Sequence, residues 1–334
     1  MRYCGTGSWR QVMVLMVVLA ISPVASVANG QPAWRPDKPV ELTLATVGGG
    51  NSDKITRLAQ KILQDRKWVS TPIVVSNRTG GNQTLAFNYV FQHPGDAHHL
   101  LLSNPVLFTN ELSGVSLRRY TDLTPLALLV IENTVLTVRT ASPIRNMTDL
   151  VRLLKADPES VSFATPSRGG QPHLSAATAM KAAGADPRKM KLVVFKGSGE
   201  STTALLGGHV DVMVASSGSI LNYVQAGQMR VIGVAAAQRV GGVLANAPTF
   251  REQGINATGV AAWRGFHGPK GLTSAQIAFW DEALAKVTDT AEWKKNLEEG
   301  DLTQQYLRSR EFAQFIEGEY AITRAAMADA GLIK

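Results

Sequence analysis

The chain has 334 residues, a formal net charge of +8 and 45% hydrophobic residues, enough apolar material for one large or two medium cores. Its basic residues are scattered and form no run interleaved with aromatic residues, which argues against a nucleic-acid-binding protein. The single cysteine, Cys4, excludes a disulfide framework, and the positive charge fits either an anionic solute or ordinary solubility.

Residues 1–28 have the pattern of a signal peptide. Arg2 and Arg10 form a basic region, residues 12–20 form an apolar core, and Ser26-Val27-Ala28 is a cleavage site of small residues. A membrane anchor is the alternative, but polar residues, proline and glycine shorten the apolar run to about half of the ~20 residues that span a bilayer. We therefore expect cleavage at this site, export to the periplasm, and a mature chain without cysteine or thiol chemistry.

The first motif after this leader is a strand, a glycine loop and the start of a helix. Alternating apolar residues from Val40 to Leu44 predict the strand, and the glycines at 48–50 allow a tight turn with outward-facing N–H groups. Asn51 or Ser52 can cap the helix, whose bare first amides favour an anion such as a carboxylate. Asp53 either complements the helix dipole, or contacts a ligand or orders the loop. The candidate ligand-binding residues here are Gly49, Gly50, Asn51, Ser52 and Asp53.

Strand-like and helix-like segments then alternate almost to the end of the chain. The predicted strands cover residues 71–75, 99–103, 160–164, 192–195, 210–214 and 229–235, with a long extended segment at 126–138. The predicted helices cover residues 85–91, 147–156, 172–183, 201–206 and a stretch ending at 226, and only helices (274–286, 291–297 and 309–330) follow residue 273. This alternation predicts a parallel-sheet α/β protein, and two sets of loops at strand ends predict two domains facing each other across a cleft.

The second set of loops supplies the other candidate ligand-binding residues. One group, just before a helix, consists of Thr165, Ser167, Gly169 and Gly170. Such residues often only cap a helix, but their position opposite the first glycine loop favours ligand contact. A structural role is favoured for His173, in the first turn of that helix. The remaining candidates are Asn104 after a strand, Lys196 and Gly197, which offer a cation and an amide, and Ser217, a hydroxyl on the pocket floor or a cap.

Other classes of site fit the sequence less well. His98 and His99 are adjacent on a strand and point to opposite faces, so they cannot readily chelate one ion, and we expect no metal and no cofactor. The glycine loop echoes a dinucleotide fingerprint, but Asp53 would repel pyrophosphate, and the acidic residue expected about 20 residues on is missing. The lack of a Gly-x-Ser-x-Gly elbow weakens a hydrolase interpretation. For Trp263, core or hinge packing is favoured over stacking on an aromatic ligand.

Several motifs follow one another in order along the whole chain after the leader. They are residues 34–40, 48–53 with Arg57, 77–82, 120–125, 195–197, 204–211, 247–254 and 330–331. Through these motifs the chain resembles the extracytoplasmic solute receptors of tripartite tricarboxylate transporters, the Bug-type periplasmic binding proteins. It departs from the family pattern at residues 45–47 and at Thr79, where the family has proline in loops near the ligand, and at residues 95–99.

The resemblance implies a type II periplasmic-binding-protein fold, with two α/β lobes and a ligand cleft between them. It implies a monomeric receptor without catalytic activity that binds a small organic carboxylate: a di- or tricarboxylate, an acidic amino acid or an aromatic carboxylate. Its partners would be large and small membrane permease subunits. The alternatives are a sensor of the same fold that reports to a signalling kinase and, as a weaker one, an exported hydrolase.

The chain is expected to cross twice between the lobes. We assign residues 29–142 and 246–334 to the first lobe and residues 143–245 to an inserted second lobe. The extended segment at 126–138 should lead out of the first lobe, and the return should lie near residues 247–249. The C-terminal helices should then pack back on the first lobe.

Overall fold

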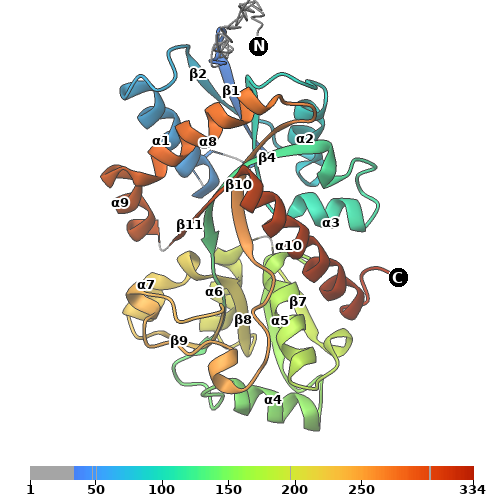
Figure 1. Cartoon of the computed structure of the whole chain (residues 1–334). Coiled ribbons are helices and arrows are strands. Elements are labelled where there is room, and N and C mark those ends of the chain that lie inside the picture. The colour runs from blue at the N-terminus through green and yellow to red at the C-terminus, as the bar shows by residue number, and fades with distance from the viewer. Residues whose placement is uncertain (1–33, 47, 50, 196, 301) are drawn as a thin grey trace, which may run out of the picture. The chain divides into compact units, whose positions relative to one another are not determined.

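Two β-sheets organise the part of the chain that this computed structural model describes, residues 34–46, 48–49, 51–195, 197–300 and 302–334 (Figure 1). The signal peptide predicted for residues 1–28 lies outside this part. From edge to edge, the first sheet consists of β11 (Thr303–Arg308), β4 (Leu123–Glu132), β10 (Ala262–Pro269), β3 (His99–Ser103), β1 (Val40–Leu44) and β2 (Ile73–Asn77). The second consists of β7 (Lys191–Val194), β6 (Ser162–Thr165), β8 (Val212–Ser216), β5 (Thr134–Arg139) and β9 (Met229–Ala235).

Both sheets are mixed, whereas the sequence predicts parallel sheets. In the first sheet β2, β1 and β3 are parallel, but β10 is antiparallel to β3 and β4, and β11 is antiparallel to β4. In the second sheet β7, β6 and β8 are parallel, and β5 is antiparallel to β8 and β9. The parallel strands follow the expected strand–helix alternation. The antiparallel ones include β5 and β10, which arrive directly from the other sheet and need no helical crossover.

Helices cover both faces of the first sheet. One face carries α1 (Asn51–Asp65), α8 (Ser274–Asp289) and α9 (Ala291–Gly300). The other carries α2 (Thr84–Phe91), α3 (Val106–Leu112) and α10 (Ser309–Asp329). The strands serve both cores by alternation, since Leu100 and Leu102 of β3 enter the first core and Leu101 enters the second. In α1, Ile55, Ala59 and Ile62 form the buried stripe that the sequence predicts.

The second sheet is covered in the same way. On one side pack α4 (Met147–Ala156) and α5 (Gln171–Ala182), and on the other α6 (Ser198–Leu206) and α7 (Leu221–Gln225). Leu136 of β5 faces the α4–α5 side and Val135 faces the α6–α7 side. Single 3₁₀ turns lie at Gly81–Gln83, Tyr120–Asp122, Pro187–Lys189, Ser217–Ser219, Gly242–Leu244 and Arg251–Gln253.

Several strands begin or end at other residues than the sequence predicts, because pairing with neighbouring strands determines where they end. The bounds of β1, β3, β9 and α4 agree with the sequence, but β2 lies two residues later than expected, since Asn77 pairs with Leu44. The strand β8 continues through Ser216, which the sequence places in a loop, because Ser216 pairs with Thr134 of β5. The expectation of helices alone after residue 273 is wrong, since β11 pairs with β4. Its six residues are mostly polar and partly exposed, as an edge strand allows.

The chain crosses from the first sheet to the second through Asn133 alone, which confirms the extended segment predicted at 126–138. It returns later than expected, because Thr249 still bridges to Val234 of β9 and the following residues pack in the second core up to Val260. The first sheet is rejoined only at β10. The helices α8 and α9 pack on the first sheet as expected, but the last turns of α10 contribute Met327 to the second core.

Candidate functional site

A cavity of about 190 Å³ lies at the carboxyl ends of strands β1 and β3. Its polar lining residues come from five separate segments and include Thr46, Ser52, Gln83, Asn104, Gln171 and Arg264. Two of the predicted ligand-binding residues, Ser52 and Asn104, therefore meet here. Gln171, which lines the same cavity, is the first residue of α5 and directly follows the second predicted loop. The carboxyl ends of strands thus hold the site, as expected for an α/β sheet.

The glycine loop before α1 is ordered by Asp53. One of its oxygens, Oδ2, accepts the backbone N–H of Gly49 at 3.0 Å and the Nε–H of Arg57 at 2.9 Å, and Oδ1 accepts Asn77 Nδ2 at 3.2 Å. The hydrogen bond from Arg57 is the main reason that the pKa of Asp53 lies below its usual value. Both carboxylate oxygens are engaged within the protein, which fits the loop-ordering interpretation. The N–H of Gly49 is likewise already used.

The helix α1 begins at Asn51, so Asn51 and Ser52 lie in its first turn and do not precede it as caps. Asn51 Nδ2 donates to Glu132 Oε1 at 3.4 Å, and Ser52 Oγ accepts the Nε–H of Arg264 at 3.0 Å. The predicted residue Gly50 lies outside the described residues. The start of α1 is therefore tied by side chains to the ends of β4 and β10.

The second predicted loop lines a neighbouring cavity of about 230 Å³. Ser167, Gly169 and Gly170 lie on its wall, together with the exposed Arg168. Val106 lines both cavities, and Gly170 is followed directly by Gln171 of the first cavity. The two predicted loops thus border two adjoining cavities.

Two other candidates, His173 and Thr165, form hydrogen bonds with the backbone of this loop. His173 is 2% exposed, and its Nδ1 accepts the N–H of Gly169 at 2.9 Å. Burial, with a smaller contribution from Arg168, lowers the pKa of His173 to about 4. Thr165 is fully buried, and its hydroxyl donates to the carbonyl of Ser167 at 3.3 Å. Both residues hold the shape of the loop, and the N–H of Gly169 is not free.

Two of the last candidates, Gly197 and Ser217, are not among the residues that line these two cavities. Gly197 precedes α6 and accepts the N–H of Ser201 through its carbonyl, and Lys196 lies outside the described residues. Ser217 is fully buried and donates its N–H to the carbonyl of Asn133, the crossing residue, at 2.8 Å. Its hydroxyl has no hydrogen-bond partner among the described residues.

The structure adds an ion pair that the sequence analysis missed. Arg264 Nη2 of β10 lies 2.8 Å from Glu132 Oε2 at the end of β4. The two strands are antiparallel, with Arg264 opposite Val130, so Glu132 is its diagonal neighbour on the same face. Both are single charges in apolar stretches, Leu126–Glu132 and Ala261–Phe266. A single charged residue within an apolar, strand-like stretch is rarely buried without a partner, so these two residues could have been predicted from the sequence to form a buried ion pair.

Three buried hydrogen-bond donors beside the first cavity have no partner among the described residues. They are Thr46 Oγ1, Trp263 Nε1 and Arg264 Nη1, and all three residues line this cavity. Trp263 is fully buried and packs on Phe108 and Phe312, as the sequence analysis favoured. Buried donors normally have partners, so three unpartnered ones on residues that line one cavity favour a group rich in acceptors, such as an anion, as its occupant.

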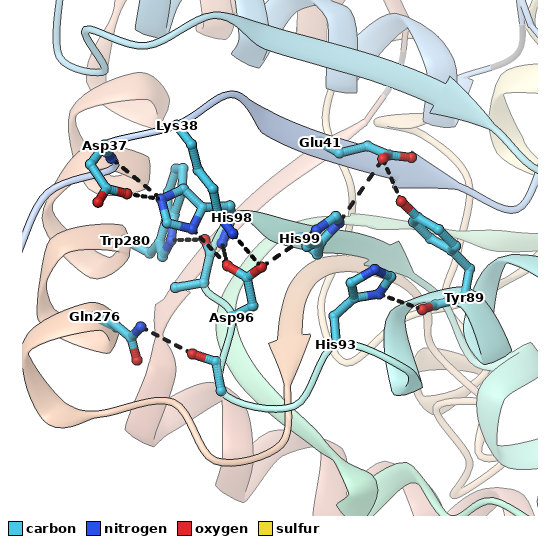
Figure 2. A network of polar contacts seen from close by, with 12 residues as sticks. Asp37, Lys38, Glu41, Tyr89, His93, Asp96, His98, His99, Gln276 and Trp280 are labelled. Carbon is cyan, nitrogen blue, oxygen red and sulfur yellow. Dashed lines mark hydrogen bonds and ion pairs between the residues drawn. The ribbon is translucent and has the colours of Figure 1, made fainter.

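A second polar cluster lies at the opposite ends of β1 and β3 (Figure 2). There His98 lies between Asp96, with Nδ1 2.6 Å from Oδ1, and Asp37, with Nε2 3.1 Å from Oδ1. His99 turns away and stacks on His93, with ring centroids 3.8 Å apart. No group of three or more His, Cys, Asp or Glu side chains in the described part of the chain is arranged to hold a metal ion. This cluster ties the start of the described chain to the sheet.

Comparisons with known proteins agree with this architecture. The family described as tripartite tricarboxylate transporter family receptor matches residues 55–332. Protein BugT of Bordetella pertussis is 24% identical, covering 78% of this chain and 79% of that protein. A solved TctC solute binding protein from Polaromonas is similar with a TM-score of 0.78, 22% identity and coverage of 88% and 99%. An R. palustris protein solved with adipate is similar with a TM-score of 0.73 and 22% identity, covering 89% of this chain and 98% of that protein.

No helix in the described ranges is long and apolar enough to span a bilayer.

Proposed function

The chain belongs to the tripartite tricarboxylate transporter receptor family, periplasmic solute-binding receptors of the Bug type, and from this premise we propose that it captures an organic carboxylate. The observation that carries the proposal is the set of three unpartnered donors of Thr46, Trp263 and Arg264 around one cavity. A carboxylate has two oxygens with about four acceptor positions, so it offers acceptors to donors on more than one side of the cavity. The adipate-bound relative supports a carboxylate as the ligand class.

In this proposal the ligand is held without any covalent step. The carboxylate lies at the start of α1, where first-turn N–H groups and the helix dipole favour an anion. Ser52 and Asn104 line the same cavity with a hydroxyl and an amide. The remainder of the ligand extends toward Ser167 and Gly170 in the adjoining cavity. Charge-assisted hydrogen bonds then replace the hydration shell of the anion.

The division into two lobes is part of the same proposal, with the crossings at Asn133 and between Val260 and β10 in place of the bounds at residues 142/143 and 245/246 that the sequence predicts. A ligand that touches loops on both sheets favours the conformation in which these loops are close. Asn133 is the direct link between β4 and β5 and absorbs the change. The closed receptor then delivers its ligand to a membrane permease with a large and a small subunit. We further propose that the chain itself catalyses no reaction.

A thermal-unfolding screen over organic acids tests the function. A ligand at 100 times its Kd is expected to raise the free energy of unfolding by about 2.7 kcal/mol. The screen includes di- and tricarboxylates, acidic amino acids, aromatic carboxylates, and phosphate-bearing nucleotides as the comparison class. Stabilisation by nucleotides with no response to any carboxylate would overturn the proposal.

A further inference from the structure

The pair Arg264–Glu132 places two opposite charges directly beside the candidate cavity. Glu132 is 4% exposed, and the side chain of Arg264 is 18% exposed. Burying such a pair requires good geometry, because both ions lose their hydration. The 2.8 Å contact between Nη2 and Oε2 provides it. The pair therefore sets the electrostatic character of this wall.

The guanidinium group of Arg264 is only partly used. Its Nη2 contacts Glu132 and its Nε–H donates to Ser52 Oγ at 3.0 Å, but Nη1 has no hydrogen-bond partner in the part of the chain that is described. A guanidinium has five N–H donors in a planar fork, so it can serve two carboxylates along different edges. Arg264 lines the cavity and its Nη1 is buried, so an anion in the cavity takes this donor once the guanidinium turns toward it.

Glu132 stands on the other side of Arg264. Glu132 and the following Asn133 line a different cavity. Glu132 Oε1 accepts a hydrogen bond from Asn51 Nδ2 at 3.4 Å. It neutralises the arginine when no ligand is bound. Once an anion binds Nη1, two carboxylates share one guanidinium, and their mutual repulsion in a partly desolvated site weakens the binding.

We propose that Arg264 is the cationic anchor of the ligand carboxylate and that Glu132, acting through Arg264, competes with the ligand and sets its affinity. This inference rests on the proposed function. It deepens that function by requiring a full negative charge on the group that enters the first cavity. An uncharged amide of the same shape leaves the guanidinium without its second anion and is rejected.

The test measures the Kd by calorimetry for four probes, adipate, citrate, glutamate and benzoate, with adipamide as the uncharged match of adipate. Arg264→Gln is expected to weaken binding of the responding acid by about tenfold or more, whereas Glu132→Gln is expected to tighten it by about tenfold. Adipamide should not bind any of these proteins. The matched controls are Arg66→Gln and Glu292→Gln, which break an exposed ion pair of 2.8 Å and should leave Kd unchanged.

The double variant Glu132→Gln/Arg264→Gln separates the two roles. Because Glu132 acts through the guanidinium, the double variant should bind like Arg264→Gln alone. If Glu132→Gln tightens binding equally without the arginine, the proposed competition is wrong. Arg264→Lys keeps the charge but not the fork, so it gives an intermediate Kd and serves if Arg264→Gln does not fold.

The binding results distinguish a failure of the Arg264 anchor from a failure of the proposed receptor function. Acids that bind the wild-type protein and Arg264→Gln equally would overturn the anchor and leave the receptor function in place. If no acid binds either the wild-type protein or Glu132→Gln, both the anchor and the proposed carboxylate receptor fail.

Discussion

The buried imidazole of His173 accepts the backbone N–H of Gly169 through Nδ1, at 2.9 Å. This bond requires Nδ1 to be unprotonated, so the ring holds the loop only in its neutral form. The loop in question lines the second cavity through Gly169 and Gly170. The shape of the candidate site is therefore linked to the protonation of one histidine.

This link predicts a loss of stability in acid. Burial lowers the pKa of His173 to about 4, whereas an unfolded histidine has a pKa of about 6.5. Between these values the unfolded chain binds more protons, so the free energy of unfolding falls as pH drops from about 6.5 to 4, by about 3 kcal/mol in total. Urea unfolding at several pH values measures this. His173→Asn keeps an acceptor without titrating and should show a shallower decline; equal slopes for the two proteins would contradict the assignment.

Removing the carboxylate of Asp53 should disorder the first loop. Asp53→Ala leaves the N–H of Gly49 and the guanidinium of Arg57 without their shared acceptor, and we expect a loss of about 1–3 kcal/mol in the free energy of unfolding. Affinity for the carboxylate should fall with it. Asp65→Ala is the control, because Asp65 also pairs with a basic residue on α1, Lys61, but both side chains are exposed. Its effect should stay within about 0.5 kcal/mol, and similar losses for both variants would contradict the role of Asp53.

Two glycine-to-alanine changes should act in opposite directions. At Gly265 of β10, an added Cβ would lie 2.7 Å from the carbonyl oxygen of Ala127 and 2.4 Å from Phe312 Cζ, so Gly265→Ala should destabilise the fold by about 1–3 kcal/mol. At Gly318, inside α10, an added Cβ meets no described atom within 4 Å. Alanine has the higher helix propensity, and Gly318→Ala should stabilise by up to about 1 kcal/mol. Thermal unfolding compares the two, and destabilisation by Gly318→Ala would show that α10 packs differently there.

Much of the fold follows from local pattern. The sequence predicts β1 by alternation of apolar residues, β3 and β9 by short apolar stretches, and α4, whose first turn the structure shows capped by Asn146 through the N–H of Asp149. The strands β10 and β11 escape this reasoning for different physical reasons. β10 contains Arg264, two glycines and a histidine, which only its central place between β3 and β4 buries. β11 is a polar edge strand, stabilised by pairing with β4 and not by its own composition.

The candidate site divides in the same way. The glycine loop, Ser52 and the loop at Ser167 could be predicted because turn residues at strand ends form local motifs. Arg264 could not be placed beside Ser52, since their 212-residue separation is closed only by the pairing of β10 with β3 and β4. Local motifs also could not reveal that the N–H groups of Gly49 and Gly169 are used by Asp53 and His173.

A negative charge at Ser167 tests whether the second loop touches the bound anion. Ser167 lines the cavity that adjoins the Arg264 cavity, so Ser167→Glu places a carboxylate beside the proposed path of the ligand. Like charges in a desolvated cleft cost several kcal/mol, and we expect binding to weaken by about 100-fold while folding changes little. Ser167→Gln has nearly the same size without the charge, so calorimetry on the pair isolates the electrostatic effect from crowding. If both variants bind the acid equally well, the second loop does not approach the carboxylate, and the ligand is held by the first cavity alone.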